Sequence, residues 1–333
     1  MKKILDVVLL MALPASGKSE VRKFMTTLTP EESAAKFHIG PTLQLDDYTY
    51  VHFMHRIDDE LKKHGWYHIF YQGPERPFQD GFEWQTLIEL LNEDFDDMVN
   101  RRVSRPESAA QLLFDRLDNA RARAGLEREL AEVPYGIRCA VARAMERECR
   151  KELVAKNRTC RAYRPGKTVF IELSRGGANG ATFPLTPPRG YDFAFQCFSE
   201  QILDRAGILY IWVTPEQSRK KNYERGRPDG AGSILFHRVP LEVMLGDYGC
   251  DDMEWLIGQS GRKDHVRVEK ILTRQVPKGK PYYENKVWHL PVARFDNRED
   301  LTTFVRGDVK KWKAEDVAKI RKELARALGV LAR

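Results

Sequence analysis

Short apolar runs recur along this chain, and each is followed by polar residues or a turn. Five of them have the length and composition of buried strands, at residues 5–11, 42–45, 168–173, 208–213 and 288–295. Stretches with apolar residues at helical spacing lie between these runs. Because strands that alternate with helices connect through right-handed crossovers, the pattern predicts an α/β fold with a parallel sheet covered on both faces.

A long segment between the second and third apolar runs is helical in pattern. Leu87, Leu90 and Leu91 fall at helical spacing within residues 84–99, and residues 107–156 contain a single proline among many Ala, Arg and Glu. We therefore expect two parts: a core made of residues 1–50 and 167–333, and a helical insertion made of residues 51–166.

The residues after the first apolar run form a motif with a specific chemistry, Ala12-Leu13-Pro14-Ala15-Ser16-Gly17-Lys18-Ser19. In such a loop, backbone N–H groups and the N-terminus of the next helix point at phosphate oxygens. Lys18 would reach the β and γ phosphates, and the Ser19 hydroxyl would ligate Mg²⁺. Ala12 stands where the motif usually has Gly, so the turn is slightly less free. The predicted nucleotide-binding residues are Pro14, Ala15, Ser16, Gly17, Lys18 and Ser19.

Several other classes of protein are excluded by the composition. The basic start and apolar run of residues 1–12 resemble a secretory signal, but Asp6 inside the run and the motif after it argue against one. No other stretch approaches the roughly 20 apolar residues of a membrane helix. The five cysteines contain no C-x-x-C pair, so neither a disulfide framework nor a cysteine zinc site is indicated. We expect a cytoplasmic protein with no membrane partner.

Polar side chains follow the second and third predicted strands, at the sheet edge where ligands bind in such folds. Asp46 and Asp47 could accept a proton from an attacking hydroxyl or hold Mg²⁺ through water. Alternatively, one of them caps the next helix. Glu172 could order Mg²⁺ or contact substrate, and Arg175 could grip an anionic or hydroxylated acceptor. The alternative for these two is that they pair with each other or with the surface.

The fourth predicted strand leads into a cationic helix. Thr214, Pro215 and Gln217 form a strong helix start. A row of cations bounded by Pro and Gly suits a lid that neutralises a phosphoryl group in transit, although most charged helices are only solvated faces. The candidate lid residues are Arg219, Lys220, Lys221, Arg225 and Arg227.

The net charge of +7 is unevenly distributed over the insertion. Residues 42–100 carry thirteen acids against four bases, whereas residues 101–167 carry seventeen bases against nine acids. The basic half could clamp nucleic acid, or its interleaved acids could make it a salt-bridged face. Aromatic residues between Trp66 and Trp84 could wall an acceptor pocket or form a small core. The pairs His52/His55 and His64/His68 have metal spacing but no recognisable third ligand.

These motifs together resemble the P-loop small-molecule and nucleic-acid kinases, which include gluconate and shikimate kinases, chloramphenicol phosphotransferase and polynucleotide kinases. The resemblance covers about half of the chain and rests on residues 13–19, 46–47, 219–227 and 291–297. It implies a three-layer sandwich with a five-stranded parallel sheet of order 2-3-1-4-5, ATP as donor and Mg²⁺ as metal. It also implies Asp46 or Asp47 as the base and Asn297 near the adenine. The insertion departs from the compact members of the group and leaves the acceptor unassigned.

The sequence thus predicts a kinase that transfers the γ-phosphoryl group of ATP to a hydroxyl, with a small molecule as the expected acceptor. Its catalytic residues would be Lys18, Asp46, Asp47, Arg219 and Arg227, with Arg225 and Asn297 contacting the nucleotide. Ser19, Asp46 and Glu172 would hold the metal, and Asp47, Glu172 and Arg175 the acceptor. A polynucleotide 5′-kinase and a nucleotide-gated RNA- or protein-binding NTPase remain alternatives, and the oligomeric state is open.

Overall fold

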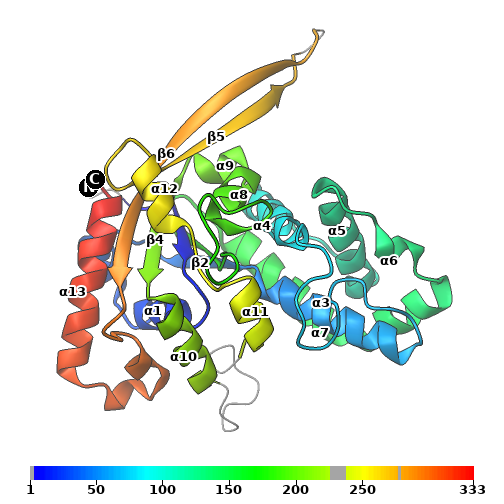
Figure 1. Ribbon diagram of the computed structural model, residues 1–333, viewed down its shortest axis with the longest axis horizontal. Helices are drawn as coiled ribbons and strands as arrows, with labels where there is room; N and C mark the ends of the chain where they lie inside the picture. Colours follow the sequence, from blue (N-terminus) through cyan, green and yellow to red (C-terminus); the bar gives the residue numbers. More distant parts are fainter. Residues whose placement is uncertain (1–3, 226–237, 277–278) are drawn as a thin grey trace.

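The computed structural model describes residues 4–225, 238–276 and 279–333. Within these ranges the chain has an α/β fold with one six-stranded sheet of order β2-β3-β1-β4-β6-β5 (Figure 1). The strands are β1 (Val7–Met11), β2 (Thr42–Asp46), β3 (Thr168–Leu173), β4 (Ala206–Trp212), β5 (His265–Arg274) and β6 (Tyr282–Asp296). None of the helices in these ranges is long and apolar enough to cross a membrane.

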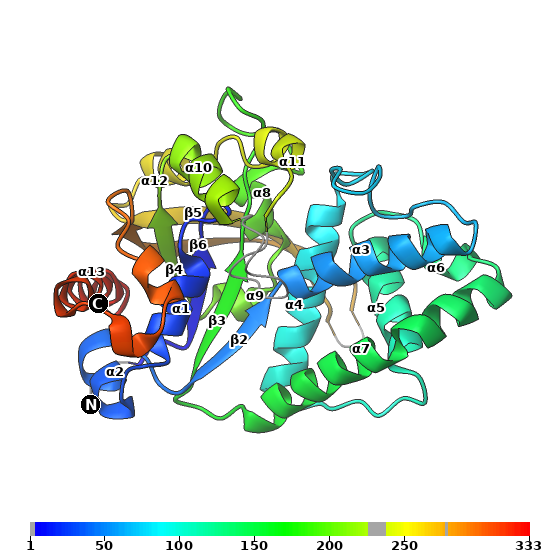
Figure 2. The ribbon, with the colours of Figure 1, turned by 90° about the horizontal axis from the view of Figure 1, so that it is seen from below.

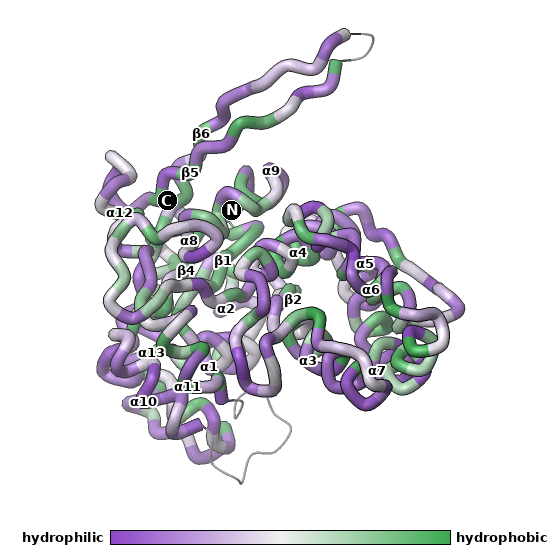
Figure 3. The backbone as a smooth tube through the Cα atoms, turned by 45° about the vertical axis from the view of Figure 1, so that its right-hand side comes forward, coloured by the Kyte–Doolittle hydropathy of each residue, from purple (hydrophilic) through white to green (hydrophobic). Residues whose placement is uncertain are grey.

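The prediction of a purely parallel, five-stranded sheet is wrong, because the sheet is mixed and its order differs. The strands β2, β3, β1, β4 and β6 pair in parallel, at the five predicted places. β5 pairs antiparallel with β6 and adds an edge strand. Its side chains alternate between buried and exposed in their first residues, a period of two typical of a strand with one solvated face. The outer part of this hairpin projects from the body as a largely hydrophilic ribbon (Figure 3).

Helices cover both faces of the sheet, because β1 and β3 are buried along their whole length and mostly apolar. One face packs against α1 (Lys18–Met25), α2 (Pro30–Phe37) and α13 (Ala314–Leu331), with Phe24, Phe37 and Phe295 fully buried between them. The other face packs against α4 (Glu83–Val99), α8 (Gly190–Cys197), α9 (Glu200–Leu203) and α12 (Met253–Gln259). The carboxyl ends of the strands therefore remain as the sheet edge open to a ligand.

The insertion is helical, as predicted, and lies beside β2 (Figure 2). It consists of α3 (Tyr48–Lys63), α4, α5 (Ala109–Arg123), α6 (Glu129–Glu132) and α7 (Tyr135–Ala162). α4 is shared between two cores: Ile88 and Leu91 pack toward the sheet, whereas Leu87 and Leu90 pack toward the other insertion helices. α4 therefore ties the insertion to the sheet, and Cys160 of α7 also packs in the sheet core.

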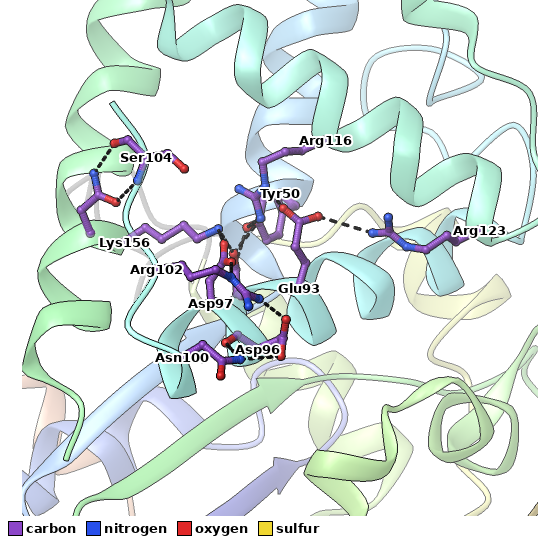
Figure 4. A network of polar contacts seen from close by, with 12 residues as sticks. Tyr50, Glu93, Asp96, Asp97, Asn100, Arg102, Ser104, Arg116, Arg123 and Lys156 are labelled. Carbon is purple, nitrogen blue, oxygen red and sulfur yellow. Dashed lines mark hydrogen bonds and ion pairs between the residues drawn. The ribbon is translucent and has the colours of Figure 1, made fainter. Parts of the chain in front are cut away.

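The uneven charge of the insertion is largely balanced within the insertion, by ion pairs between its acidic and its basic half. Arg116 of α5 donates to Glu93 and Asp94 of α4, each at 2.6 Å, and Lys156 of α7 lies 2.7 Å from Asp97 of α4 (Figure 4). Basic residues of the second half thus neutralise acids of the first. For these cations, the predicted alternative of a salt-bridged face holds. Other cations of the insertion, Arg143, Arg147 and Lys151, are exposed on α7. A nucleic-acid role for this exposed surface of α7 stays a prediction.

Four elements complete the surroundings of the open sheet edge. They are α10 (Pro215–Arg225), α11 (Leu241–Gly246) and the 3₁₀ turns η3 (Thr303–Arg306) and η4 (Val309–Lys311). The start of α10 is the predicted one, since the Gln217 amide donates to the Thr214 hydroxyl at 3.2 Å and the Thr214 amide donates to the Gln217 side chain at 3.0 Å. This reciprocal capping fixes the direction in which the cationic helix leaves β4.

Candidate active site

The β1–α1 loop, residues 12–17, turns sharply so that α1 begins at Lys18. Two residues of the loop have positive φ, Ala15 at 59° and Gly17 at 108°. The first N–H groups of α1 have no partner within the helix and face the carboxyl edge of the sheet. Such an arrangement of amides at a helix N-terminus favours an anion.

Gly17 is required by space as well as by its φ angle. A Cβ atom built on Gly17 would lie 2.5 Å from the Thr302 hydroxyl oxygen and 2.7 Å from the Asn297 side-chain nitrogen. Both atoms belong to the segment that packs behind the loop, so a side chain at this position would push the loop away from its support.

Gly17→Ala is therefore expected to lower the free energy of unfolding by about 1–3 kcal/mol, the usual cost of overpacking. Urea unfolding of the purified variant measures this. The matched control is Gly136→Ala in α7, where nothing lies within 4 Å of the new Cβ. We expect that change to leave stability equal or raise it by up to about 1 kcal/mol. A Gly17→Ala variant as stable as the wild type would contradict the packing argument.

The loop is held from behind by polar side chains. Asn297 donates to the Ser16 carbonyl at 2.7 Å and accepts from the Leu301 amide at 2.7 Å. Ser218 of α10 donates to the Pro14 carbonyl at 2.7 Å. Asn297 is fully buried and its side chain supports the loop, while its expected place near an adenine stays a prediction.

Lys18 crosses the mouth of the loop. Its ammonium donates to the Ala12 carbonyl at 3.1 Å and to the hydroxyl of Ser174, the residue after β3. Burial lowers the pKa of Lys18, and the nearby carboxylates Glu172 and Asp47 oppose that shift. A buried ammonium held by neutral oxygens is a cation available to an incoming anion.

Asp46 and Glu172 lie side by side, since they are partners in the register of β2 and β3. Arg22 of α1 joins them: its Nη1 atom is 2.6 Å from Glu172 Oε2 and 3.2 Å from Asp46 Oδ2. Burial raises the pKa of Asp46 to about 8, with the Glu172 and Asp47 charges adding to the rise. Sequence reasoning missed Arg22, although it follows Lys18 by four residues and so shares its face of α1.

Asp47 is held by Arg175. The guanidinium of Arg175 donates to Asp47 at 2.7 Å and to the Trp84 carbonyl at 3.2 Å, and it stacks 4.8 Å from the centre of the Trp84 ring. Burial raises the pKa of Asp47, while Arg175 opposes the rise. Asp47 occupies the N-cap position of α3 without a capping hydrogen bond, whereas Asp46 accepts from the amide of Tyr48, the first residue of α3, at 3.0 Å. The capping alternative therefore holds for Asp46 and leaves the Asp47 carboxylate for another role.

Two expectations about the charged pair after β3 therefore change. Glu172 and Arg175 do not pair with each other, because each has a carboxylate or guanidinium partner from another element. Arg175 is only 2% exposed, so it positions Asp47 and does not present a free cation to an acceptor.

The helix α10 brings one of its predicted cations to the site. Arg225 lies 3.4 Å from Glu20 of α1, a fully buried carboxylate that also accepts from Arg306 at 2.6 Å. Burial lowers the pKa of Arg225. Arg219 instead contacts Glu216 at 3.0 Å and Asn179 at 3.4 Å, and Arg227 lies outside the described residues.

A single cavity of about 160 Å³ joins these groups. Its polar half is lined by the loop and the strand ends: Pro14, Ala15, Ser16, Lys18, Ser19, Asp46, Asp47, Glu172, Ser174 and Arg225. Its other half is apolar and aromatic, with Val51, His55, Tyr71, Phe78, Trp84, Val239, Val243 and Tyr248 among the lining residues. Tyr71, Phe78 and Trp84 also belong to the insertion core, so the predicted small core is present, and a role of this cavity in binding an acceptor stays a prediction.

The oxygen donors near the loop fit Mg²⁺. Ser19, Asp46 and Glu172 all line the cavity and offer the hard oxygen ligands that this ion prefers. Across the described part of the chain, no group of three or more His, Cys, Asp or Glu side chains could hold a metal. Mg²⁺ commonly takes one or two carboxylates and completes its shell with phosphates and water. Of the predicted histidine pairs, His52 lies against Glu148 and His55 stacks on Tyr71.

No family model and no curated sequence matches the chain. The chemistry of this site follows from the geometry. Amides, Lys18 and Arg225 make the loop end of the cavity attractive to a polyanion. Asp47, a buried carboxylate with a raised pKa, lies where that end meets the apolar half. A carboxylate whose pKa is raised is a stronger base than an exposed one and can accept a proton from a hydroxyl.

Proposed function

We propose that this protein is an ATP- and Mg²⁺-dependent kinase that transfers a γ-phosphoryl group to an acceptor hydroxyl. The observation that carries the proposal is the continuity of one cavity from Lys18 and Ser19 to the Asp47 carboxylate. A phosphate site alone would suit many nucleotide-binding proteins. The adjoining pocket with a positioned base suits a group transfer.

The fold agrees with the proposal. The loop follows a central strand, β1, which has β3 on one side and β4 on the other. The parallel strands β2, β3, β1, β4 and β6 follow one another across the sheet, with helices on both faces. We assign this part of the fold to the three-layer P-loop sandwich, extended by the antiparallel strand β5.

Each side chain then has a role in positioning or in neutralising charge. The loop amides and Lys18 hold the β and γ phosphates, and Arg225 adds a second cation. Asp47, oriented by Arg175, takes the proton of the acceptor hydroxyl as its oxygen forms a bond to the γ phosphorus. The bond from that phosphorus to the bridging oxygen breaks, and ADP leaves. Mg²⁺, when bound by Ser19 and through Asp46 or Glu172, neutralises charge on the phosphate oxygens.

Asp47 is a better candidate for the base than Asp46. Asp46 accepts hydrogen bonds from the Tyr48 amide at 3.0 Å and from Arg22 at 3.2 Å, beside Glu172. These contacts place it next to the metal ligands. Asp47 has one strong partner, Arg175, and its neighbours across the cavity are aromatic side chains of the insertion.

A thermal-shift series tests the nucleotide part of this proposal. A ligand that binds only the native state raises Tm with its concentration, so MgATP at about 100 times its Kd should stabilise the protein by about 2.7 kcal/mol. AMP, which lacks the β and γ phosphates, should give no comparable shift, and EDTA should reduce the shift from ATP. An equal response to AMP and MgATP would contradict the assignment of the loop.

A further inference from the structure

The apolar half of the cavity has a continuous wall of rings. His55 stacks on Tyr71 at 3.6 Å between ring centres, and Tyr71 stacks on Phe78 at 4.6 Å. Trp84 meets Phe78 edge-on at 4.8 Å and Tyr248 at 5.6 Å. These rings come from α3, from α4, from the segment between these two helices and from the segment after α11. Rings already fixed against one another lose little freedom when a further ring packs against them.

The charges around this half are already paired. Arg175 is held by Asp47, Arg76 by Glu242, and Arg189 by Asp247 at 2.5 Å. Within the described residues, the lysine and arginine side chains that line the cavity are Lys18, Arg76 and Arg225. Two of these belong to the phosphate end, and the third lies at the rim with 57% of its side chain exposed.

The remaining charged groups of the lining are carboxylates. Asp47 and Asp247 border the apolar half, and Asp46 and Glu172 lie beyond them. A carboxylate or phosphate on the acceptor would lose its water against these acids without gaining a free cation from the residues that the structure describes. Burying a charge without a partner is costly.

We propose that the phosphoryl acceptor is a small uncharged alcohol that carries a flat aromatic ring. The ring packs against Trp84 and Tyr248, and the hydroxyl lies at Asp47. This inference rests on the proposed kinase function and excludes sugar acids and the 5′ ends of polynucleotides as preferred acceptors.

Two matched alcohols provide the test. Para-methylbenzyl alcohol and para-hydroxymethylbenzoate share a ring and a hydroxymethyl group but differ by one negative charge. We expect the neutral alcohol to be phosphorylated from MgATP with a kcat/KM at least about tenfold higher, a difference of about 1.4 kcal/mol. Its Kd in the presence of MgADP, measured by calorimetry, should be lower by a similar factor. Cyclohexylmethanol and a 5′-hydroxyl oligonucleotide should both be poorer acceptors.

Variants separate the ring contact from the charge. Tyr248→Leu should raise the KM for the neutral alcohol and leave the Kd for MgATP unchanged, whereas Tyr135→Leu, at a position 84% exposed on α7, should change neither. Glu242→Gln frees Arg76 at the rim, so the preference against para-hydroxymethylbenzoate should shrink about two- to fivefold, the range of an exposed ion pair.

The outcomes distinguish this inference from the proposed function. If MgATP does not bind, the kinase proposal fails. If MgATP and MgADP bind but the anionic alcohol or the oligonucleotide is the better acceptor, the ring-alcohol inference is overturned and the kinase proposal stands. Failure of both benzyl alcohols to bind in the presence of MgADP would also overturn it.

Discussion

Lys18→Met will lower kcat/KM for phosphoryl transfer by on the order of 10²- to 10³-fold, the loss typical of removing one positioned donor to developing charge. Methionine keeps the length of the side chain and removes its charge. The ammonium of Lys18 is buried, and burial lowers its pKa, so the charge is costly in the nucleotide-free protein. We therefore expect Lys18→Met to unfold at the same urea concentration as the wild type or a higher one, while its MgATP-induced Tm shift disappears.

The control for this prediction is Lys36→Met. Lys36 lies on α2 with 65% of its side chain exposed and pairs with Glu32 at 3.4 Å. Its replacement should leave both turnover and the response to MgATP unchanged. A Lys18→Met protein that still binds MgATP with wild-type affinity would remove the central support of the proposed function.

Asp47→Asn will lower kcat by about 10²- to 10⁴-fold, the range attributed to a general base, with the Kd for MgATP nearly unchanged. Asparagine keeps the shape of the side chain but cannot take the acceptor proton. The variant also leaves the buried guanidinium of Arg175 without its carboxylate, so some loss of stability is expected. Steady-state kinetics and calorimetry on the same preparation separate the two effects.

Asp46→Asn is the matched comparison. Asp46 lies with Glu172 and Arg22 near the metal ligands. Its replacement should therefore raise the Mg²⁺ concentration required for half-maximal rate by a larger factor than it lowers kcat at saturating Mg²⁺. If Asp46→Asn abolishes kcat and Asp47→Asn does not, the two carboxylates have the opposite roles.

The rate should also depend on pH in a direction set by burial. A base works only when deprotonated, and burial raises the pKa of Asp47 above its ordinary value near 4. The wild-type kcat/KM should therefore fall as the pH decreases through that raised pKa. The residual rate of Asp47→Asn should lack this acidic limb.

The strands and the loop were predictable because their signals are local. The apolar runs gave β1, β2, β3, β4 and the end of β6, and parallel strands bring their carboxyl ends to one edge. That rule placed the loop, Asp46, Asp47 and Glu172 around one cavity, as they are found. The signal for β5 was also local, a period-two alternation in residues 265–268. This alternation covers only four residues, and the strand that continues it is rich in charged residues.

The choice of partner for each charged side chain was not predictable from the pattern. Arg175 looked free beside two glycines, yet its partner is Asp47, 128 residues away. Asn297 lies behind a loop 281 residues distant. Arg22 was hidden among ordinary helix residues. Such pairings depend on which groups the fold buries together, because a buried charge without a partner raises the free energy of the folded state.

The sequence by itself determined that this chain builds an α/β sheet with a tight loop after β1 and carboxylates at its open edge. Strand periodicity, the loop motif with Gly17 and the acids at strand ends act over a few residues, so they are visible without the fold. Only the tertiary structure decided that Arg175 orients Asp47, that Asn297 supports the loop, and that insertion rings close the far side of the cavity. These contacts join residues distant in the chain, and their free energy comes from desolvation and packing that local sequence does not encode.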